Sequence, residues 1–175
     1  IWRHISGSLF DVSASADGQV WGCNGTHQIY RRNGAAWTRV PGSLRQISVA
    51  REGLVWGVNN NDRIARGNGR GWTQVAGTLR HVSVGSDGTV WGVNADSKIY
   101  RWNGTDWTQV AGALRQISVG SASAVWGVNS RDEIYRWSGS AWQKQTGKLK
   151  HVSVAADGTV WGTNAANNIY KWSGG

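Results

Sequence analysis

The chain has 175 residues and a formal net charge of +9, with 25 glycines, 13 tryptophans and a single proline. This length is sufficient for one well-packed core, so we expect a single domain over residues 1–175. The composition suits short strands joined by tight turns rather than a helical bundle. No apolar run approaches the roughly 20 residues of a membrane-spanning helix, so we expect no transmembrane segment.

One dipeptide recurs five times at a fixed spacing. Trp-Gly is repeated every 35 residues, at 21–22, 56–57, 91–92, 126–127 and 161–162. A constant period of this length indicates a repeat architecture, in which one small unit is made several times along the chain.

Residues 76–110 illustrate the elements that we expect in each repeat. Runs rich in β-branched and aromatic residues predict four strands, at 79–84, 89–94, 98–102 and 107–110. Asp87-Gly88 and Asn103-Gly104 predict tight hairpin turns, because these residue types tolerate a positive φ. Four strands of about five residues leave no room for a helix in the repeat.

A repeated four-stranded antiparallel unit is typical of a β-propeller blade. A β-solenoid is the alternative, and the hairpin turns argue against it. The segment at residues 2–5 is in register with the fourth strands, whereas residues 149–172 supply only three strands. We therefore predict an all-β propeller of five four-stranded blades, closed by an N-terminal strand that completes the C-terminal blade.

The repeat W-x-x-V-x-G-x-L-x-x-I-S-V-x-x-D-G-x-V-W-G-V-N-x-x-x-x-I-Y-R resembles the tectonin repeat over the whole chain. The best copies span residues 72–101 and 107–136, although the second has Ala122-Ser123 in place of the Asp-Gly turn. The resemblance implies a β-propeller, in a family that often has six blades, so part of a larger ring is the alternative to five closed blades. Many members are lectins that bind sugars or bacterial lipopolysaccharide, and others are intracellular scaffolds.

Comparison of the repeats separates two kinds of tryptophan. The positions of Trp91 and Trp107 hold tryptophan in all five repeats, which indicates packing residues. A third position varies, reading Arg32, Gly67, Trp102, Trp137 and Trp172. A core position would hardly accept such changes, so we predict that this one faces solvent and that its indoles stack on sugar rings. The alternative is a tryptophan that lies over the rim of a neighbouring blade.

An asparagine follows the second strand of every repeat, and a tyrosine precedes the basic residue of the third strand in four of them. The asparagine either caps the loop or offers its amide to a sugar hydroxyl. Repeat two has Ala65 instead of tyrosine, and repeat one has Arg32 instead of tryptophan. We predict ligand-binding sites at blade edges in repeats three to five, formed by Asn94, Tyr100, Arg101, Trp102, Asn129, Tyr135, Arg136, Trp137, Asn164, Tyr170, Lys171 and Trp172.

The positive charge is also repeated. One position is basic in every repeat, as Arg31, Arg66, Arg101, Arg136 and Lys171. In a ring these residues form a circle, either as an anion-binding surface or as charged strand edges that prevent pairing. Expected partners are glycans, including anionic, phosphorylated or methylated sugars, and lipopolysaccharide. No nucleic-acid-binding motif is present, so we expect no nucleic acid partner.

Neither a catalytic nor a metal site is predicted. Cys23 is the single cysteine, the histidines have no metal-ligand spacing, and the aspartates belong to turns. We therefore expect no enzymatic activity and no cofactor. The residues and the resemblance together favour a multivalent lectin with a role in innate defence, extracellular or on a cell surface. A protein-interaction scaffold without sugar binding is the alternative, and a cytoplasmic location would suit it.

Overall fold

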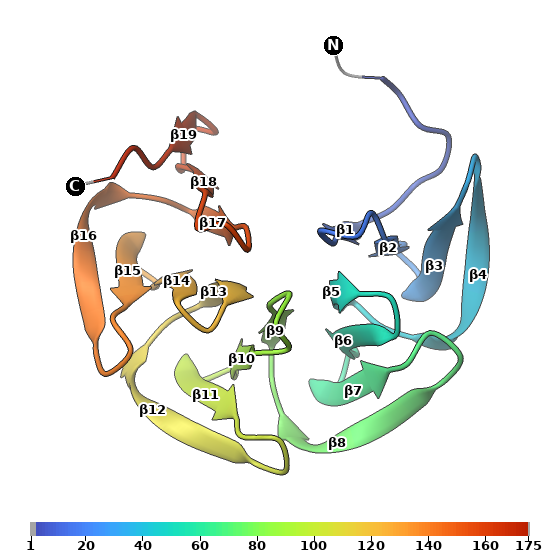
Figure 1. Cartoon of the computed structure of the whole chain (residues 1–175), viewed down its shortest axis with the longest axis horizontal. Coiled ribbons are helices and arrows are strands. Elements are labelled where there is room, and N and C mark those ends of the chain that lie inside the picture. Colours follow the sequence, from blue (N-terminus) through green and yellow to red (C-terminus); the bar gives the residue numbers. More distant parts are fainter. Residues whose placement is uncertain (1–2, 175) are drawn as a thin grey trace.

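A computed structural model describes residues 3–174, which form five antiparallel sheets arranged as the blades of a β-propeller (Figure 1). The first blade contains β1 (Asp11–Ala14), β2 (Val20–Cys23), β3 (Gln28–Asn33) and β4 (Ala36–Ser43). The second contains β5 (Gln46–Arg51), β6 (Leu54–Val58), β7 (Arg63–Gly67) and β8 (Trp72–Thr78). The third contains β9 (His81–Val84), β10 (Val90–Val93), β11 (Lys98–Trp102) and β12 (Trp107–Ala113).

The fourth blade contains β13 (Gln116–Ser121), β14 (Ala124–Val128), β15 (Glu133–Trp137) and β16 (Trp142–Lys148). The fifth contains β17 (His151–Val154), β18 (Val160–Thr163) and β19 (Ile169–Lys171). The predicted all-β, five-bladed propeller is thus confirmed. The described residues include no helix, and so none that could cross a membrane.

The first strand of each blade lies near the centre of the ring and the fourth strand lies at its outside (Figure 1). Side chains join neighbouring inner strands. Gln46 accepts the Val82 N–H at 2.9 Å and donates to the Val82 carbonyl at 3.0 Å, and Gln116 forms the same pair of bonds with Val152. Asp11 accepts the Ile47 N–H at 2.8 Å. These bonds fix the register between blades.

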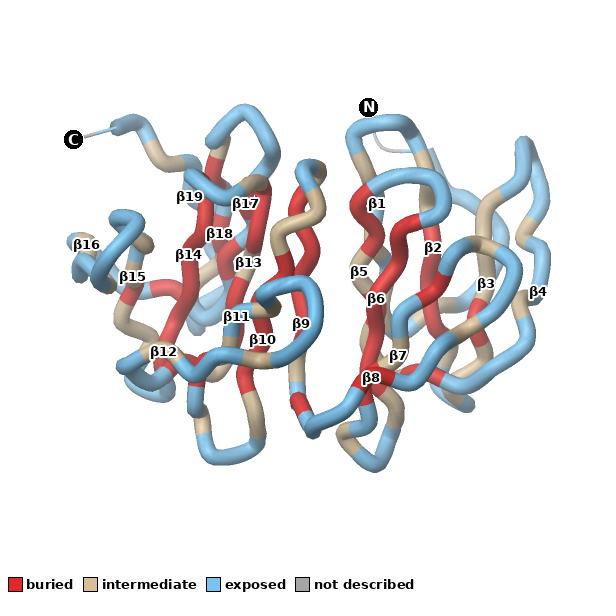
Figure 2. The backbone as a smooth tube through the Cα atoms, turned by 60° about the horizontal axis from the view of Figure 1, so that its bottom comes forward, coloured by how far each residue is buried: buried red, intermediate tan, exposed pale blue. Residues whose placement is uncertain are grey.

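The hydrophobic core lies between the blades, and burial follows the inner strands rather than the outer ones (Figure 2). Trp91 is 1% exposed and packs with Ile99 of its own blade and Ile117 of the next. The glycine after this tryptophan is sterically required. A Cβ on Gly92 would lie 2.3 Å from the Leu79 Cδ1 atom and 2.9 Å from a backbone carbonyl oxygen.

The predicted closure through the N-terminus is wrong for the residues that the structure describes. The fifth sheet has three strands, and residues 3–8 belong to no strand. Ser6 instead accepts a 3.0 Å hydrogen bond from the Trp37 indole, just as Pro41 accepts one from Trp72. This bond holds the N-terminal segment beside the first blade, across a gap from β19 (Figure 1). Trp2, the first residue of the predicted closing strand, lies outside the described residues.

The gap leaves two blade faces uncovered. Val12 is 60% exposed, whereas its counterpart Val82 is completely buried. On the other side Trp161 is 48% exposed, although the corresponding Trp91 is buried. The ring is therefore open between its first and fifth blades.

Candidate functional site

The repeated asparagine shapes the loop between the second and third strands. In the third blade, Asn94 Oδ1 accepts the N–H groups of Asp96 at 3.0 Å and Lys98 at 2.9 Å. Ser97, which lies between them, has a φ of 63°. The asparagine in each of the other four blades accepts the same two N–H groups. Because the loop uses the carbonyl oxygen in this way, mainly the amide nitrogen is left to meet a ligand.

A cleft of about 230 Å³ lies between the second and third blades. Ile64 and Leu79 form one wall. Asn94, Tyr100 and Trp107 of the third blade also line it. The structure thus brings together two of the predicted site residues, Asn94 and Tyr100, and adds a tryptophan that the sequence analysis assigned to packing.

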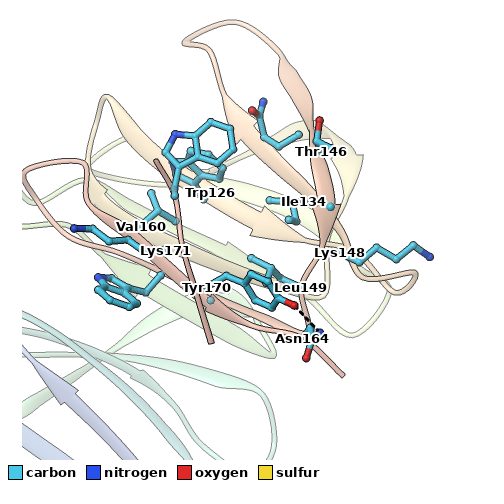
Figure 3. A pocket seen from close by; sticks show the side chains of 14 residues that line it. Trp126, Ile134, Thr146, Lys148, Leu149, Val160, Asn164, Tyr170 and Lys171 are labelled. Carbon is cyan, nitrogen blue, oxygen red and sulfur yellow. Dashed lines mark hydrogen bonds between the residues drawn. The ribbon is translucent and has the colours of Figure 1, made fainter. Parts of the chain in front are cut away.

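An equivalent cleft of about 420 Å³ lies between the fourth and fifth blades (Figure 3). Ile134 and Leu149 correspond to the apolar wall, and Asn164 donates to the Tyr170 hydroxyl at 3.3 Å. Lys171 and Trp172 also line it. This cleft is larger because no described residue takes the place that Trp107 has in the third blade.

The tryptophans predicted to face solvent are half-buried, so that orientation is wrong and the alternative, packing against a neighbouring blade, holds; their stacking on sugar rings stays a prediction. Each packs edge-on against the core tryptophan of the preceding blade. The ring centroids of Trp102 and Trp56 are 5.6 Å apart. The distance is 5.2 Å in the two other pairs, Trp137–Trp91 and Trp172–Trp126. Trp102 and Tyr100 are two residues apart on β11, so both side chains lie on the strand face that is turned toward the second blade.

Local packing explains the variation at this position. A Cβ on the buried Gly67 would lie only 2.8 Å from the ring of Trp72, which occupies the space in the second blade. In the first blade, beside the gap, the Arg32 guanidinium lies 5.4 Å from the Trp37 ring centroid. Arginine and glycine are therefore accepted because their neighbours differ.

The predicted ring of basic residues covers the core tryptophans. The Arg101 guanidinium lies 5.7 Å from the Trp91 ring centroid. The corresponding cations of the other blades lie at 5.7–5.9 Å, namely Arg31, Arg66, Arg136 and Lys171. Such cation–π contacts stabilise the rim of each blade. Arg101 and Arg136 accordingly lie apart from the clefts that contain Asn94 and Asn164.

The first residue of the third strand differs most in its chemistry between clefts. In the first blade, Gln28 Oε1 accepts Asn24 Nδ2 at 2.9 Å and the Tyr30 hydroxyl at 3.1 Å. Within the described part of the chain, the corresponding groups of the third blade, Asn94 Nδ2 and Tyr100 OH, form no hydrogen bond.

Glu133 has this place in the fourth blade. Its Oε2 atom accepts Asn129 Nδ2 at 2.7 Å and the Tyr135 hydroxyl at 3.2 Å, and its Oε1 atom accepts Lys144 Nζ at 2.7 Å. The bonds from Lys144 and Asn129 lower the pKa of Glu133 to about 2. Sequence analysis missed this position, although its change in charge between repeats was a visible signal.

The titratable groups offer little for catalysis. Burial raises the pKa of the Cys23 thiol to about 12, so it is no nucleophile at neutral pH. Burial also lowers the pKa of His81 to about 4. No group of histidine, cysteine or carboxylate side chains among residues 3–174 could hold a metal ion.

Five radial sheets with repeated clefts between them define a β-propeller whose blade interfaces carry the candidate sites. The sequence matches the Tectonin domain over residues 1–68, 46–139 and 122–175, and the chain belongs to this family. Among curated proteins, none matches the sequence.

Two solved structures share the fold, each with a TM-score of 0.65. One is described as YCF48 bound to D1 peptide, 16% identical and matched over 95% of this chain. The other is YCF48 from Cyanidioschyzon merolae, 14% identical and matched over 94%. The chain covers 65% and 66% of those two chains, and at these identities the likeness concerns the fold alone.

Proposed function

We propose that the protein is a lectin, a binding protein rather than an enzyme, which holds glycans in the clefts between its blades. The cleft of the third blade is the observation that supports this most. There the Asn94 side-chain nitrogen and the Tyr100 hydroxyl have no hydrogen-bond partner among the described residues, and Trp107 lines the same cleft. An aromatic face next to unengaged polar groups suits a sugar, which has an apolar C–H face and a rim of hydroxyls.

Repetition of the cleft supports multivalent binding. The clefts at Asn94 and Asn164 lie at two different blade interfaces of the same chain. Linked sites can exceed the affinity of a single site by about 10²–10⁴-fold on a surface that is dense in ligand. Glycans of cells or microbes, including anionic or modified sugars and lipopolysaccharide, are the ligands that we propose, with an extracellular or cell-surface location and a role in innate defence.

A protein-interaction scaffold is the second candidate. The exposed apolar side chains at the gap favour it, because uncovered faces of this kind mark interaction surfaces: Phe10 and Val12 on one side, and Trp161, Ile169 and Tyr170 on the other. One of the similar folds is described as bound to a peptide.

A glycan array tests the proposal, with Tyr100→Phe as the diagnostic variant. Losing one hydroxyl contact should weaken binding of the best glycan by about three- to ten-fold, in line with the usual strength of a hydrogen bond. Tyr135→Phe is the matched control, because Glu133 already engages that hydroxyl. An array without any bound glycan would contradict the lectin and leave the scaffold as the better explanation.

A further inference from the structure

We infer that the first residue of the third strand selects which inter-blade clefts bind a glycan. This selector position begins the third strand in the first four blades and directly precedes β19 in the fifth. From the first blade to the fifth it is occupied by Gln28, Arg63, Lys98, Glu133 and Asn168. The inference rests on the proposed function and deepens it, because it assigns specificity to a position outside the residues that line the cleft of the third blade.

The backbone explains why one residue controls both polar groups. The selector follows the loop asparagine by four residues and precedes the tyrosine by two. Alternate residues of a strand share a face, so the selector and the tyrosine point to the same side. The loop that Asn129 caps brings its amide nitrogen to that side too, and the Glu133 carboxylate contacts both groups.

A selector that accepts hydrogen bonds closes the cleft. The Gln28 and Glu133 oxygens each engage an asparagine amide and a tyrosine hydroxyl, which are the groups that a sugar would need. A ligand would have to replace these bonds, and the bond to an ionised carboxylate is the stronger kind. The cleft of the fourth blade is therefore closed. The same bonds engage these groups in the first blade, which borders the gap and has no preceding blade to complete a cleft (Figure 1).

Lys98 leaves the cleft of the third blade open. An ammonium group only donates, so it cannot engage the Asn94 amide nitrogen and cannot accept from the Tyr100 hydroxyl. Its own charge adds a further donor on the same strand face. Three donors in this arrangement favour a sugar that carries a carboxylate, sulfate or phosphate group beside its hydroxyls.

The remaining clefts fit the same rule. The second blade has Arg63, also a donor, but Ala65 stands in place of tyrosine. In the fifth blade Asn168 forms no side-chain hydrogen bond within residues 3–174, and Asn164 donates to the Tyr170 hydroxyl. That hydroxyl keeps its proton for a ligand, so the fifth cleft is partly open.

Three positions distinguish the third and fourth clefts in this respect: the selector, its cross-strand neighbour, and Arg131, which lies 3.6 Å from the Glu133 carboxylate and has Asp96 as its counterpart. Lys144, which bonds to Glu133, is paired across the strands with Tyr135, and its counterpart Gln109 is paired with Tyr100. Arg131 is largely exposed, so exchanging the selector and its cross-strand neighbour should still exchange the open and closed states. Glu133→Lys with Lys144→Gln would open the fourth cleft, and Lys98→Glu with Gln109→Lys would close the third.

The test is isothermal titration calorimetry with the best-bound acidic glycan from the array. We expect one more site per chain in the first double variant, one fewer in the second, and the original number when all four changes are combined. Glu133→Gln is the matched control. It removes the charge but keeps an acceptor, as Gln28 does, so it should add no site.

A second measurement does not depend on the sugar. Hydrogen exchange of the Asn129 side-chain amide, followed by NMR, should accelerate in the Glu133→Lys/Lys144→Gln variant and stay slow in Glu133→Gln. Glycan binding with unchanged site numbers, or exchange that stays slow in the double variant, would overturn the selector and leave the lectin standing. A wild-type protein that binds no glycan would overturn both.

Discussion

At the scale of single residues, the first residue of the inner strands shows how one position can hold different side chains. Gln46 and Gln116 bond both to a backbone N–H and to a carbonyl of the next blade. His81 has the equivalent place in the third blade, where its Nδ1 atom is enclosed and lacks a hydrogen-bond partner among the described residues. An enclosed ring nitrogen without a partner is held in its neutral form, which explains its low pKa.

His81 should make folding sensitive to acid. Burial first, and then the charges of His151 and Arg45, lower its pKa to about 4 from the ordinary value of 6.5. Between these values the unfolded chain binds a proton that the folded chain does not, so the free energy of unfolding falls as the pH is lowered from 6.5 to 4. The loss should reach about 1–3 kcal/mol, a range that allows for the partial exposure of the side chain.

Urea denaturation of His81→Gln across this pH range checks the prediction. The variant should lose most of that dependence and gain stability at neutral pH, because glutamine restores the bonds that Gln46 forms. His4→Gln changes an exposed histidine and serves as the control. Equal pH profiles for wild type and His81→Gln would show that His81 is not the acid-sensitive group.

At the scale of the element, the second strand of each blade packs against the linker that leads into the blade. Gly92 on β10 faces Leu79 in the linker before β9, and all five Trp-Gly dipeptides have this close contact with a leucine. The glycine therefore allows the second strand of the blade to approach the linker that precedes its first strand. The repeated motif reflects packing within the blade rather than ligand binding.

Gly92→Ala should lower the free energy of unfolding by about 1–3 kcal/mol, as overpacking of a core does. The added methyl group would meet the Leu79 side chain and also a backbone carbonyl oxygen, which cannot easily move. Gly71→Ala is the matched control, since its Cβ would enter open space. Thermal unfolding measures both, and a Gly92→Ala protein as stable as the control would contradict this packing.

Strands and turns could be predicted from the sequence because they depend on local rules. The expected strand at 98–102 coincides with β11, and Gly88 and Gly104 have the positive φ that their turns require. The contacts between blades could not be predicted in this way. Trp102 is half-buried because of Trp56, which lies 46 positions earlier in the chain, and no periodic pattern shows that pairing.

The candidate site was predicted in part for the same reason. Asn94 and Tyr100 share a cleft, but Arg101 and Trp102 turn to other contacts. Comparison of repeats identified residues that stay constant, whereas the state of each cleft depends on Lys98 or Glu133, which change. Only the hydrogen bonds of the folded blade show what those changes do.

At the scale of the whole molecule, the ring is open. The sequence predicts a closed ring, because the N-terminal segment is in register with the fourth strands of the other repeats. In a closed five-bladed ring, Arg3 would pair with Lys171 as Thr108 pairs with Arg101. The structure instead places the N-terminal segment across the gap from β19 (Figure 1).

A cysteine pair distinguishes the two arrangements. Arg3→Cys with Lys171→Cys should form no intrachain disulfide under mild oxidation, because the two positions lie on opposite sides of the gap and a disulfide needs Cα atoms within about 7 Å. Electrophoresis without reductant gives the result, with Arg101→Cys/Thr108→Cys as the positive control. Complete intrachain crosslinking of the terminal pair would show that the ring closes in solution.

The central claim, that a glycan binds between the second and third blades, is tested most directly by NMR. Titration of the protein with its best array glycan should shift the Trp107 indole N–H and the Asn94 side-chain amide at the same glycan concentrations. The corresponding signals of Trp142 and Asn129, in the closed fourth cleft, should stay in place. Shifts confined to residues outside the inter-blade clefts, or equal shifts in the third and fourth clefts, would contradict the account.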